Sequence, residues 1–246
     1  MFTYPHTGLD IETVQYFNSF CGQSLFWDTL GLVFLSTDAL RTAILVSIVM
    51  GIWEYGRFKN HKESNIRVIK ILFSIILTLG IIEILNALID SPRPIVSFPD
   101  LIQTPLLHSD TKILWTESWV RNVKHGSFPS DTVALISSIA CGIFLWNRLI
   151  GSIAFLFVIC VGVLPRLYFG LHYPSDMILG IIIAAMSVFI IEKISLFTNL
   201  SKTILKIEEQ FPLAFGIIGF YTAYIIADKF MLLRKLPVWL RVMSGS

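Results

Sequence analysis

Charged residues are scarce in this chain, and their scarcity excludes an ordinary soluble protein. Asp, Glu, Lys and Arg make up 15% of its 246 residues, against about a quarter in a typical soluble domain. Hydrophobic residues make up 54%, and the mean hydropathy is +0.72. The apolar residues fall into several separate runs, and a helix needs about 20 mostly apolar residues to cross a bilayer. The composition therefore predicts an all-α fold, a polytopic transmembrane helical bundle.

Other absences narrow the class of protein further. The N-terminal residues hold no basic region followed by an apolar core, so we expect no cleavable signal peptide. The net charge is only +2, and no basic tract is interleaved with aromatic residues, which argues against a nucleic-acid partner. The three cysteines have neither the spacing of a metal site nor that of a disulfide framework.

The apolar runs predict about six membrane spans. We expect them at residues 38–55, 66–89, 130–146, 149–164, 174–191 and 211–227. Residues 1–35 mix aromatic and acidic side chains, which is typical of helices that lie at the membrane interface. Residues 36–196 then form the transmembrane core, and residues 197–246 form a C-terminal helical segment and tail.

Charges between the spans predict the orientation of the bundle. Residues 56–70, between the first two spans, hold five basic side chains and one acidic side chain. Short loops rich in Lys and Arg stay in the cytoplasm. Counting spans from this loop puts the end of the chain outside, whereas basic residues near that end favour the inside. The side of the C-terminus therefore stays open.

Three polar clusters, at residues 90–94, 126–131 and 165–176, fall at outer ends of predicted spans, where they can meet. In the third cluster, Arg166 is followed by His172 after five residues and by Asp176 after three more. Pro174 suits the first turn of a helix, which puts Asp176 in that turn and His172 just before it. The carboxylate can then hold one ring nitrogen and leave the other free as a base or nucleophile. Taken alone, Arg166 could equally anchor to lipid headgroups.

The other two clusters can hold an anion. Ser130 and Asp131 begin the third span, where such residues commonly cap a helix. The same helix end, with its free N–H groups and positive dipole, also favours a bound anion. Arg93 stands between Pro92 and Pro94, and a guanidinium held stiffly in this way suits bidentate binding of phosphate.

Together these residues resemble the type 2 phosphatidic acid phosphatase superfamily, especially its bacterial undecaprenyl-diphosphatase branch. The matching motifs are Arg93-Pro94, Phe128-Pro129-Ser130-Asp131 and Arg166-x5-His172-x3-Asp176, within roughly residues 25–195. The resemblance implies an outward-facing site that needs no metal and no other cofactor. It also implies that His172 attacks phosphorus to give a phosphohistidine and that Asp176 orients its ring. Arg93, Arg166 and Ser130 would hold the phosphoryl oxygens.

Two positions depart from the family pattern. The family usually has a lysine seven residues before the arginine of its first motif, and this chain has Asn86 there. The family's second motif usually ends in a histidine that protonates the leaving group, and this chain has Thr132 there. Lys124 and His125 could replace the lost pair, or they could be solvated loop residues. The candidate substrate-binding residues are therefore Asp131, Lys124, His125, Asn86 and Thr132.

The missing general acid favours a particular substrate. General acid catalysis contributes ~10²–10⁴-fold, most of all for a poor leaving group such as an alkoxide. A phosphate leaving group is far more stable as an anion. We therefore expect a membrane lipid phosphatase that acts on a lipid diphosphate, such as a polyprenyl diphosphate, at the outer face of the inner (cell) membrane.

Two alternatives remain at the level of the sequence. A lipid phosphotransferase would pass the phosphate to a second lipid or glycolipid, since a lipid hydroxyl and water would attack the same phosphohistidine. A lipid-phosphate-binding pseudoenzyme would explain the lost lysine and general acid. In each case the partners are a lipid phosphate and the bilayer, and the oligomeric state is unknown.

The remaining histidines, His6, His61 and His108, have no partners in the sequence and are expected to be solvated.

Overall fold

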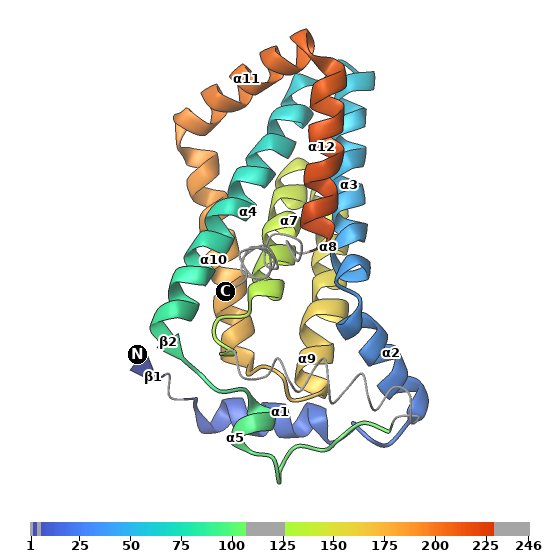
Figure 1. Ribbon diagram of the computed structural model, residues 1–246, viewed down its shortest axis with the longest axis vertical. Coiled ribbons are helices and arrows are strands. Elements are labelled where there is room, and N and C mark those ends of the chain that lie inside the picture. The colour runs from blue at the N-terminus through green and yellow to red at the C-terminus, as the bar shows by residue number, and fades with distance from the viewer. Residues whose placement is uncertain (1, 4–5, 107–125, 229–246) are drawn as a thin grey trace, which may run out of the picture.

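The computed structural model describes residues 2–3, 6–106 and 126–228 and folds them into a long helical bundle (Figure 1). Its elements are β1 (Phe2–Thr3), α1 (Gly8–Asn18), α2 (Leu25–Ser36), α3 (Asp38–Phe58), α4 (Lys62–Leu88), β2 (Ile89–Asp90), α5 (Pro94–Ser97), α7 (Asp131–Trp146), α8 (Arg148–Phe157), a π-helical segment (Val158–Val163), α9 (Leu164–Tyr168), α10 (Pro174–Lys193), α11 (Ser195–Gln210) and α12 (Pro212–Ala227). The predicted all-α class is confirmed. Within these described ranges, the one departure is a parallel pairing of two residues from β1 with two from β2.

Helix α7 lies at the centre of the bundle and packs against α3, α4, α8 and α10. Its sequence, DTVALISSIACGIFLW, is apolar on nearly every face, as in a helix that is buried in a core or in a membrane. Leu135, Ile136, Ile139 and Ile143 have no exposed surface. The core of the fold is therefore built around this helix, whose first residue follows Ser130.

Three of the helices are long and apolar enough to cross a bilayer, namely α4, α10 and the continuous helical run 148–168. The pair α2 and α3, bent by 57°, could make a fourth crossing. Helices α7 and α12 are apolar but have only 16 residues each. The described residues thus form a membrane-spanning bundle, and the count of six spans stays a prediction.

One predicted boundary is wrong. We expected the fourth span to end at residue 164, before Pro165, but the helical run continues to Tyr168. The π-helical segment Val158–Val163 changes the hydrogen-bond register just before the proline, so that Pro165 stands in the first turn of α9. A proline is tolerated in a first turn because its missing N–H has no partner there. Arg166 is carried into the bundle as a result.

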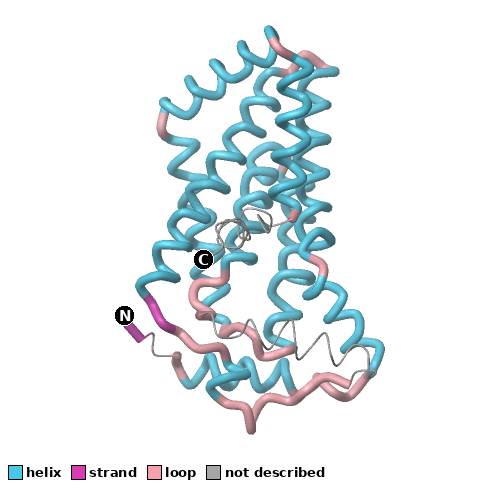
Figure 2. Tube along the Cα trace, viewed as in Figure 1, coloured by secondary structure: helices cyan, strands magenta, loops and turns pink. Residues whose placement is uncertain are grey.

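The N-terminal helices lie across one end of the bundle (Figure 1). The Asp10 carboxylate caps α1 through Thr7 and also accepts a hydrogen bond from the backbone N–H of Ser175, 3.1 Å away, at the start of α10. The buried Asn18 side chain donates to the carbonyl of Tyr168, at 2.8 Å. These bonds tie α1 to α9 and α10, which is the end where the loops gather (Figure 2).

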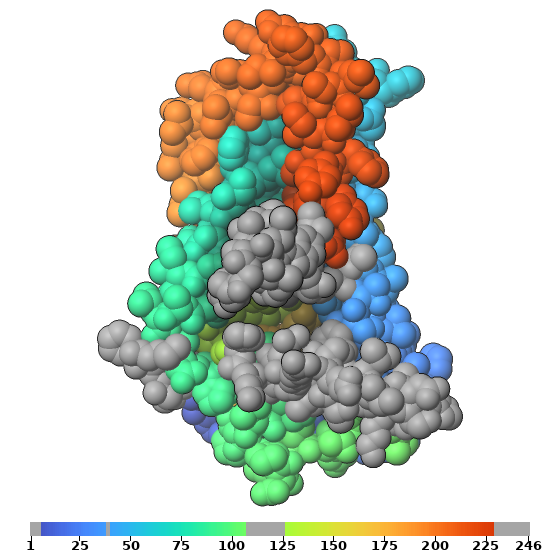
Figure 3. Space-filling view, viewed as in Figure 1, coloured from blue at the N-terminus to red at the C-terminus, as the bar shows by residue number. Residues whose placement is uncertain are grey.

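The opposite end is held by ion pairs. Glu192 of α10 binds both Arg67 and Lys70 of α4, and Lys62 binds Glu209 of α11 at 2.7 Å. Figure 3 shows α11 and α12 at this end of the face in view, far from the segment around α5. The two ends of the bundle therefore differ, with basic residues of the α3–α4 turn at one and the polar clusters at the other.

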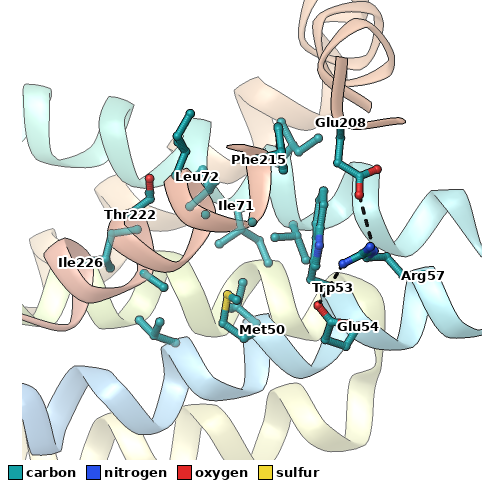
Figure 4. Close-up of a pocket in the computed structure, with 18 of the residues that line it drawn as sticks. Met50, Trp53, Glu54, Arg57, Ile71, Leu72, Glu208, Phe215, Thr222 and Ile226 are labelled. Atoms are coloured by element: carbon teal, nitrogen blue, oxygen red, sulfur yellow. Dashed lines mark ion pairs between the residues drawn. The ribbon is translucent and has the colours of Figure 1, made fainter. Parts of the chain in front are cut away.

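An apolar groove between α3, α4 and α12 belongs to the basic end (Figure 4). Trp53 and Phe215 stack within it, with ring centroids 5.5 Å apart. Arg57, one of the residues that line it, pairs with Glu54 at 3.7 Å and with Glu208 at 3.4 Å. Its lining among the described residues includes no histidine, cysteine or serine, and so no nucleophile of these types.

Candidate functional site

The three polar clusters of the sequence come together at the end of the bundle covered by α1. Backbone hydrogen bonds join the second cluster to the first, Ser127 N–H to Ser91 O at 2.7 Å, and to the third, Ser130 N–H to Asp176 O at 3.1 Å. A third bond, Ile95 N–H to Gly170 O at 3.0 Å, joins the residue just after the first cluster to the third. The segments involved are the loop after α4, the approach to α7 and the loop between α9 and α10. Residues up to 86 positions apart in the sequence therefore form one site.

His172 lies at the centre of this site with 7% of its side chain exposed. Its Nδ1 atom is 2.9 Å from the carbonyl oxygen of Ser127 and 3.5 Å from Oδ2 of Asp176. A carbonyl oxygen can only accept, so Nδ1 must carry a hydrogen. In the neutral ring the lone pair is then on Nε2, the nitrogen that a nucleophile would use.

Asp176 is fully buried and held in the first turn of α10. Its Oδ2 atom accepts a hydrogen bond from the backbone N–H of Tyr173 at 2.9 Å. The predicted pairing with His172 is present, but the Ser127 carbonyl is the closer acceptor for the ring. The sequence did not point to Ser127, because a backbone carbonyl leaves no pattern in side-chain types.

Burial keeps the His172 ring neutral. It lowers the pKa of His172 from 6.5 to about 4, with help from the positive charges of Arg93 and Arg166 and against the opposing pull of Asp176. A neutral imidazole has a lone pair to donate, whereas a protonated one has none. At pH 7 the ring is therefore in the form that can attack phosphorus.

Two arginines lie near that ring, and the side chain of each is largely buried from solvent. Arg166 is 5% exposed, and its Nη1 donates to the carbonyl of Gly162 at 2.7 Å. Burial lowers the pKa of Arg93, while Asp131 and Asp176 act to raise it. Guanidinium groups of this kind bind phosphate strongly because charge-assisted hydrogen bonds gain strength out of water.

Two of the buried hydrogen-bond donors here that have no acceptor among the described residues lie beside the start of α7. They are Nε of Arg93 and Oγ of Ser130, and Ser130 itself has no exposed surface. A buried donor without an acceptor costs about 1–3 kcal/mol, so such groups usually meet a ligand or water. The donors of Arg93 and Ser130, together with the N-terminus of α7, form a site that favours the binding of an anion.

The candidate substrate-binding residues fall into three groups. Asp131 and Thr132 lie in the first turn of α7, where Oδ1 of Asp131 accepts from the backbone N–H of Thr132 at 2.6 Å and from its hydroxyl at 3.2 Å. Asn86 is half-buried in the last turn of α4, and its Oδ1 has no partner in the described part of the chain. Lys124 and His125 lie outside the described residues.

One residue of the site was assigned wrongly from the sequence. His6 was expected to be solvated, but its Nε2 lies 2.8 Å from Oγ of Ser91, and its ring stacks on Tyr173 with centroids 3.5 Å apart. No spacing in the sequence could have found it, since its partners stand 85 and more positions away. It comes from the N-terminal segment, ahead of α1.

No metal site is evident at this position. The described ranges hold no group of three or more His, Cys, Asp or Glu side chains placed to bind a metal ion. The three cysteines are free, and Cys21 is buried among apolar side chains. Independence from metal stays a prediction that a chelator can test.

Comparison with known proteins identifies a family. Residues 67–199 match the profile of the PAP2 superfamily, a range that is more than half of the chain and contains all three polar clusters. The solved structure of Aquifex aeolicus LpxE is similar, with a TM-score of 0.53 over 76% of this chain and 97% of that chain. The two are 23% identical, so this similarity concerns the fold. No curated protein matches the chain.

Proposed function

Because the chain belongs to the PAP2 superfamily, and with it to the membrane lipid phosphatases, we propose that it releases phosphate from a lipid diphosphate through a phosphohistidine on His172. The buried neutral ring of His172, with Nδ1 facing a carbonyl, is the observation that carries the proposal. The narrower resemblance to the undecaprenyl-diphosphatase branch belongs to the same proposal and rests on the sequence motifs alone.

The first step forms a nitrogen–phosphorus bond. The Nε2 lone pair of His172 attacks the terminal phosphorus, the bond from phosphorus to the bridging oxygen breaks, and its electron pair leaves with the lipid monophosphate. The ring then carries a positive charge at Nδ1–H, which the Ser127 carbonyl and the Asp176 carboxylate stabilise. Water next attacks phosphorus, the nitrogen–phosphorus bond breaks, and inorganic phosphate leaves with His172 neutral again.

The oxygens of the transferred group need donors throughout both steps. Arg93, Arg166 and the hydroxyl of Ser130 supply them, and the orphaned donors on Arg93 and Ser130 support this assignment. Such donors are buried before substrate arrives, so little reorganisation is needed in the transition state. Asp131 and Thr132 lie in the first turn of α7, beside these donors, and would contact the rest of the headgroup.

The leaving group distinguishes a diphosphate from a simple phosphate ester. Thr132 stands where the family places a general acid, and its hydroxyl is bonded to Asp131. A threonine hydroxyl is too weak an acid to protonate a departing alkoxide at neutral pH. A lipid phosphate leaves as a stable anion without that proton, so the substitution favours a lipid diphosphate such as a polyprenyl diphosphate.

The charges at the two ends of the bundle support an outward-facing site. Helix α4 has 27 residues and is therefore about 40 Å long. Basic residues from Arg57 to Lys70 gather at its start, and the polar clusters begin at its end. With the basic end in the cytoplasm, the site faces the extracytoplasmic side of the cell membrane.

The alternatives gain no support. Nothing in the part of the chain that the structure describes selects a lipid acceptor over water. A protein that only binds lipid phosphate would not need the nucleophile-ready tautomer of His172. We therefore keep hydrolysis as the proposed reaction.

A direct test is the release of phosphate from a panel of lipid mono- and diphosphates by the purified protein in detergent, with EDTA present. We expect polyprenyl diphosphate to be hydrolysed faster than phosphatidate, and we expect His172→Ala to abolish release from both. Faster hydrolysis of phosphatidate would contradict the substrate class, and turnover by His172→Ala would contradict the nucleophile.

A further inference from the structure

His6 makes two contacts that both lead to the nucleophile. Its Nε2 lies 2.8 Å from Oγ of Ser91, whose Oγ lies 3.0 Å from Oγ of Ser127. The carbonyl of Ser127 is the acceptor for Nδ1 of His172. The His6 ring also stacks on Tyr173, the residue that directly follows His172 in the chain.

The connecting serines form a rigid link. Ser91 and Ser127 have no exposed surface, and they are joined twice, by their hydroxyls at 3.0 Å and by the Ser127 N–H to the Ser91 carbonyl at 2.7 Å. A displacement of Ser91 therefore moves the Ser127 peptide, including the carbonyl that faces His172. Buried, mutually satisfied hydrogen bonds of this kind hold one geometry because every alternative leaves a polar group without a partner.

The N-terminal segment is fixed on both sides of His6. Before it, β1 pairs with β2, the strand that leads directly to Ser91. After it, Thr7 caps α1, and Asp10 accepts from the backbone N–H of Ser175 in the first turn of α10. His6 is thus held against the loop after α4 and the start of α10 at once.

We propose that His6 is a positioning residue for His172, acting through Ser91 and Ser127 to hold the Nδ1–H tautomer that leaves Nε2 free to attack phosphorus. The proposal rests on the proposed function for its catalytic meaning, but the position of the ring is a property of the protein by itself. His6 lies in the N-terminal segment, outside the range that matches the superfamily.

The kinetic test compares His6→Ala with His6→Gln, because a glutamine amide can bond to Ser91 from nearly the position of Nε2. His6→Ala should lower kcat about 3- to 10-fold, the effect of one lost hydrogen bond, with KM nearly unchanged. His6→Gln should recover most of that kcat. A loss in His6→Ala confined to KM, or no recovery with glutamine, would contradict a role through Ser91.

A double-mutant cycle asks whether His6 acts through Ser91. The variant Ser91→Ala removes the middle of the link, so adding His6→Ala to it should cost little more. Fully additive losses would show that His6 acts by another route and would overturn the proposal. His61→Ala is the matched control, because His61 makes the same kind of bond to a serine, with Nδ1 2.9 Å from Oγ of Ser64, at the opposite end of α4.

A second readout does not depend on turnover. In protein labelled with ¹⁵N-histidine, the His172 ring should show the Nδ1–H tautomer, and His172→Ala assigns its signals. His6→Ala and Ser91→Ala should both give mixed tautomers at His172, while His61→Ala leaves the ring unchanged. An unaltered His172 spectrum in His6→Ala would overturn the role of His6, whether or not the protein hydrolyses lipid. If the tautomers mix in His6→Ala but the wild-type protein hydrolyses no lipid, the role of His6 stands and the proposed function is refuted.

Discussion

Replacing Arg93 by glutamine should move the titration of His172 to higher pH. The His172 ring has a pKa of about 4 instead of 6.5, mainly because it is buried and also because Arg93 and Arg166 are positive. The gap corresponds to ~3 kcal/mol in favour of the neutral ring. Glutamine removes one of the two positive charges and keeps a polar side chain of similar length.

The size of the shift follows from the charge removed. A single charge close to a buried group changes its pKa by about 1 or more. The acid limb of the kcat/KM profile reports the pKa of His172 in the free enzyme. We therefore expect the midpoint of this limb to move from about pH 4 in the wild type to about pH 5 or above in Arg93→Gln. At pH 5.5 the wild-type ring is almost wholly neutral, whereas a ring with the ordinary pKa would be only about one-tenth neutral.

The assay is the pH profile of phosphate release, with a titration of the His172 ring signal by NMR as the measurement that is independent of substrate. The substrate's own ionisation is the same for both proteins, so only the difference between their profiles is attributed to His172. A limb that does not move in Arg93→Gln, or one that moves to lower pH, would refute the argument that Arg93 lies close enough to act on the ring.

The same pKa determines how acid affects stability. The unfolded chain holds a proton on His172 below about 6.5, and the folded chain does so only below about 4. The folded state therefore loses up to ~3 kcal/mol as the pH falls from about 6.5 to about 4, and it keeps this contribution above 6.5. A melting temperature that falls over this window in the wild type, and falls less in His172→Ala, is the expected result.

Three further predictions concern single changes. Asp176→Asn should lower kcat at least about tenfold, because the charged His172 intermediate loses a buried carboxylate; single-turnover kinetics check this, and wild-type kcat would contradict it. EDTA should leave activity unchanged, and a loss restored by a divalent cation would contradict a metal-independent site. Gly151→Ala should destabilise the α7–α8 turn by ~1–3 kcal/mol, since an added Cβ would lie 2.1 Å from Cα of Phe144. Gly51→Ala, with no atom within 4 Å of the added Cβ, is its control in thermal melts.

Several elements could be predicted from the sequence because local chemistry determines them. The start of α10 was predicted at Pro174 and found there, since proline at a first helical position both permits and marks a beginning. The start of α7 was predicted from Ser130 and Asp131, residue types that commonly begin a helix, and α7 begins at Asp131. The meeting of the three polar clusters was also predicted, and backbone hydrogen bonds between them confirm that they meet.

Other features were out of reach because they depend on tertiary contacts. The continuation of the helix beyond Pro165 requires a π-helical segment that no residue type announces. The pairing of β1 with β2 involves two residues in each strand, too few for any periodic pattern. The role of the Ser127 carbonyl and the contacts of His6 arise from packing between segments that are distant in the sequence.

The most direct test of the central claim is to trap the covalent intermediate. The protein is mixed for milliseconds with a polyprenyl diphosphate labelled in its terminal phosphate and is then quenched in base, in which a phosphohistidine survives. The expected result is a label on the peptide that contains His172, lost on treatment with acid and absent from His172→Ala. A label on any other residue, or steady turnover by His172→Ala, would contradict it.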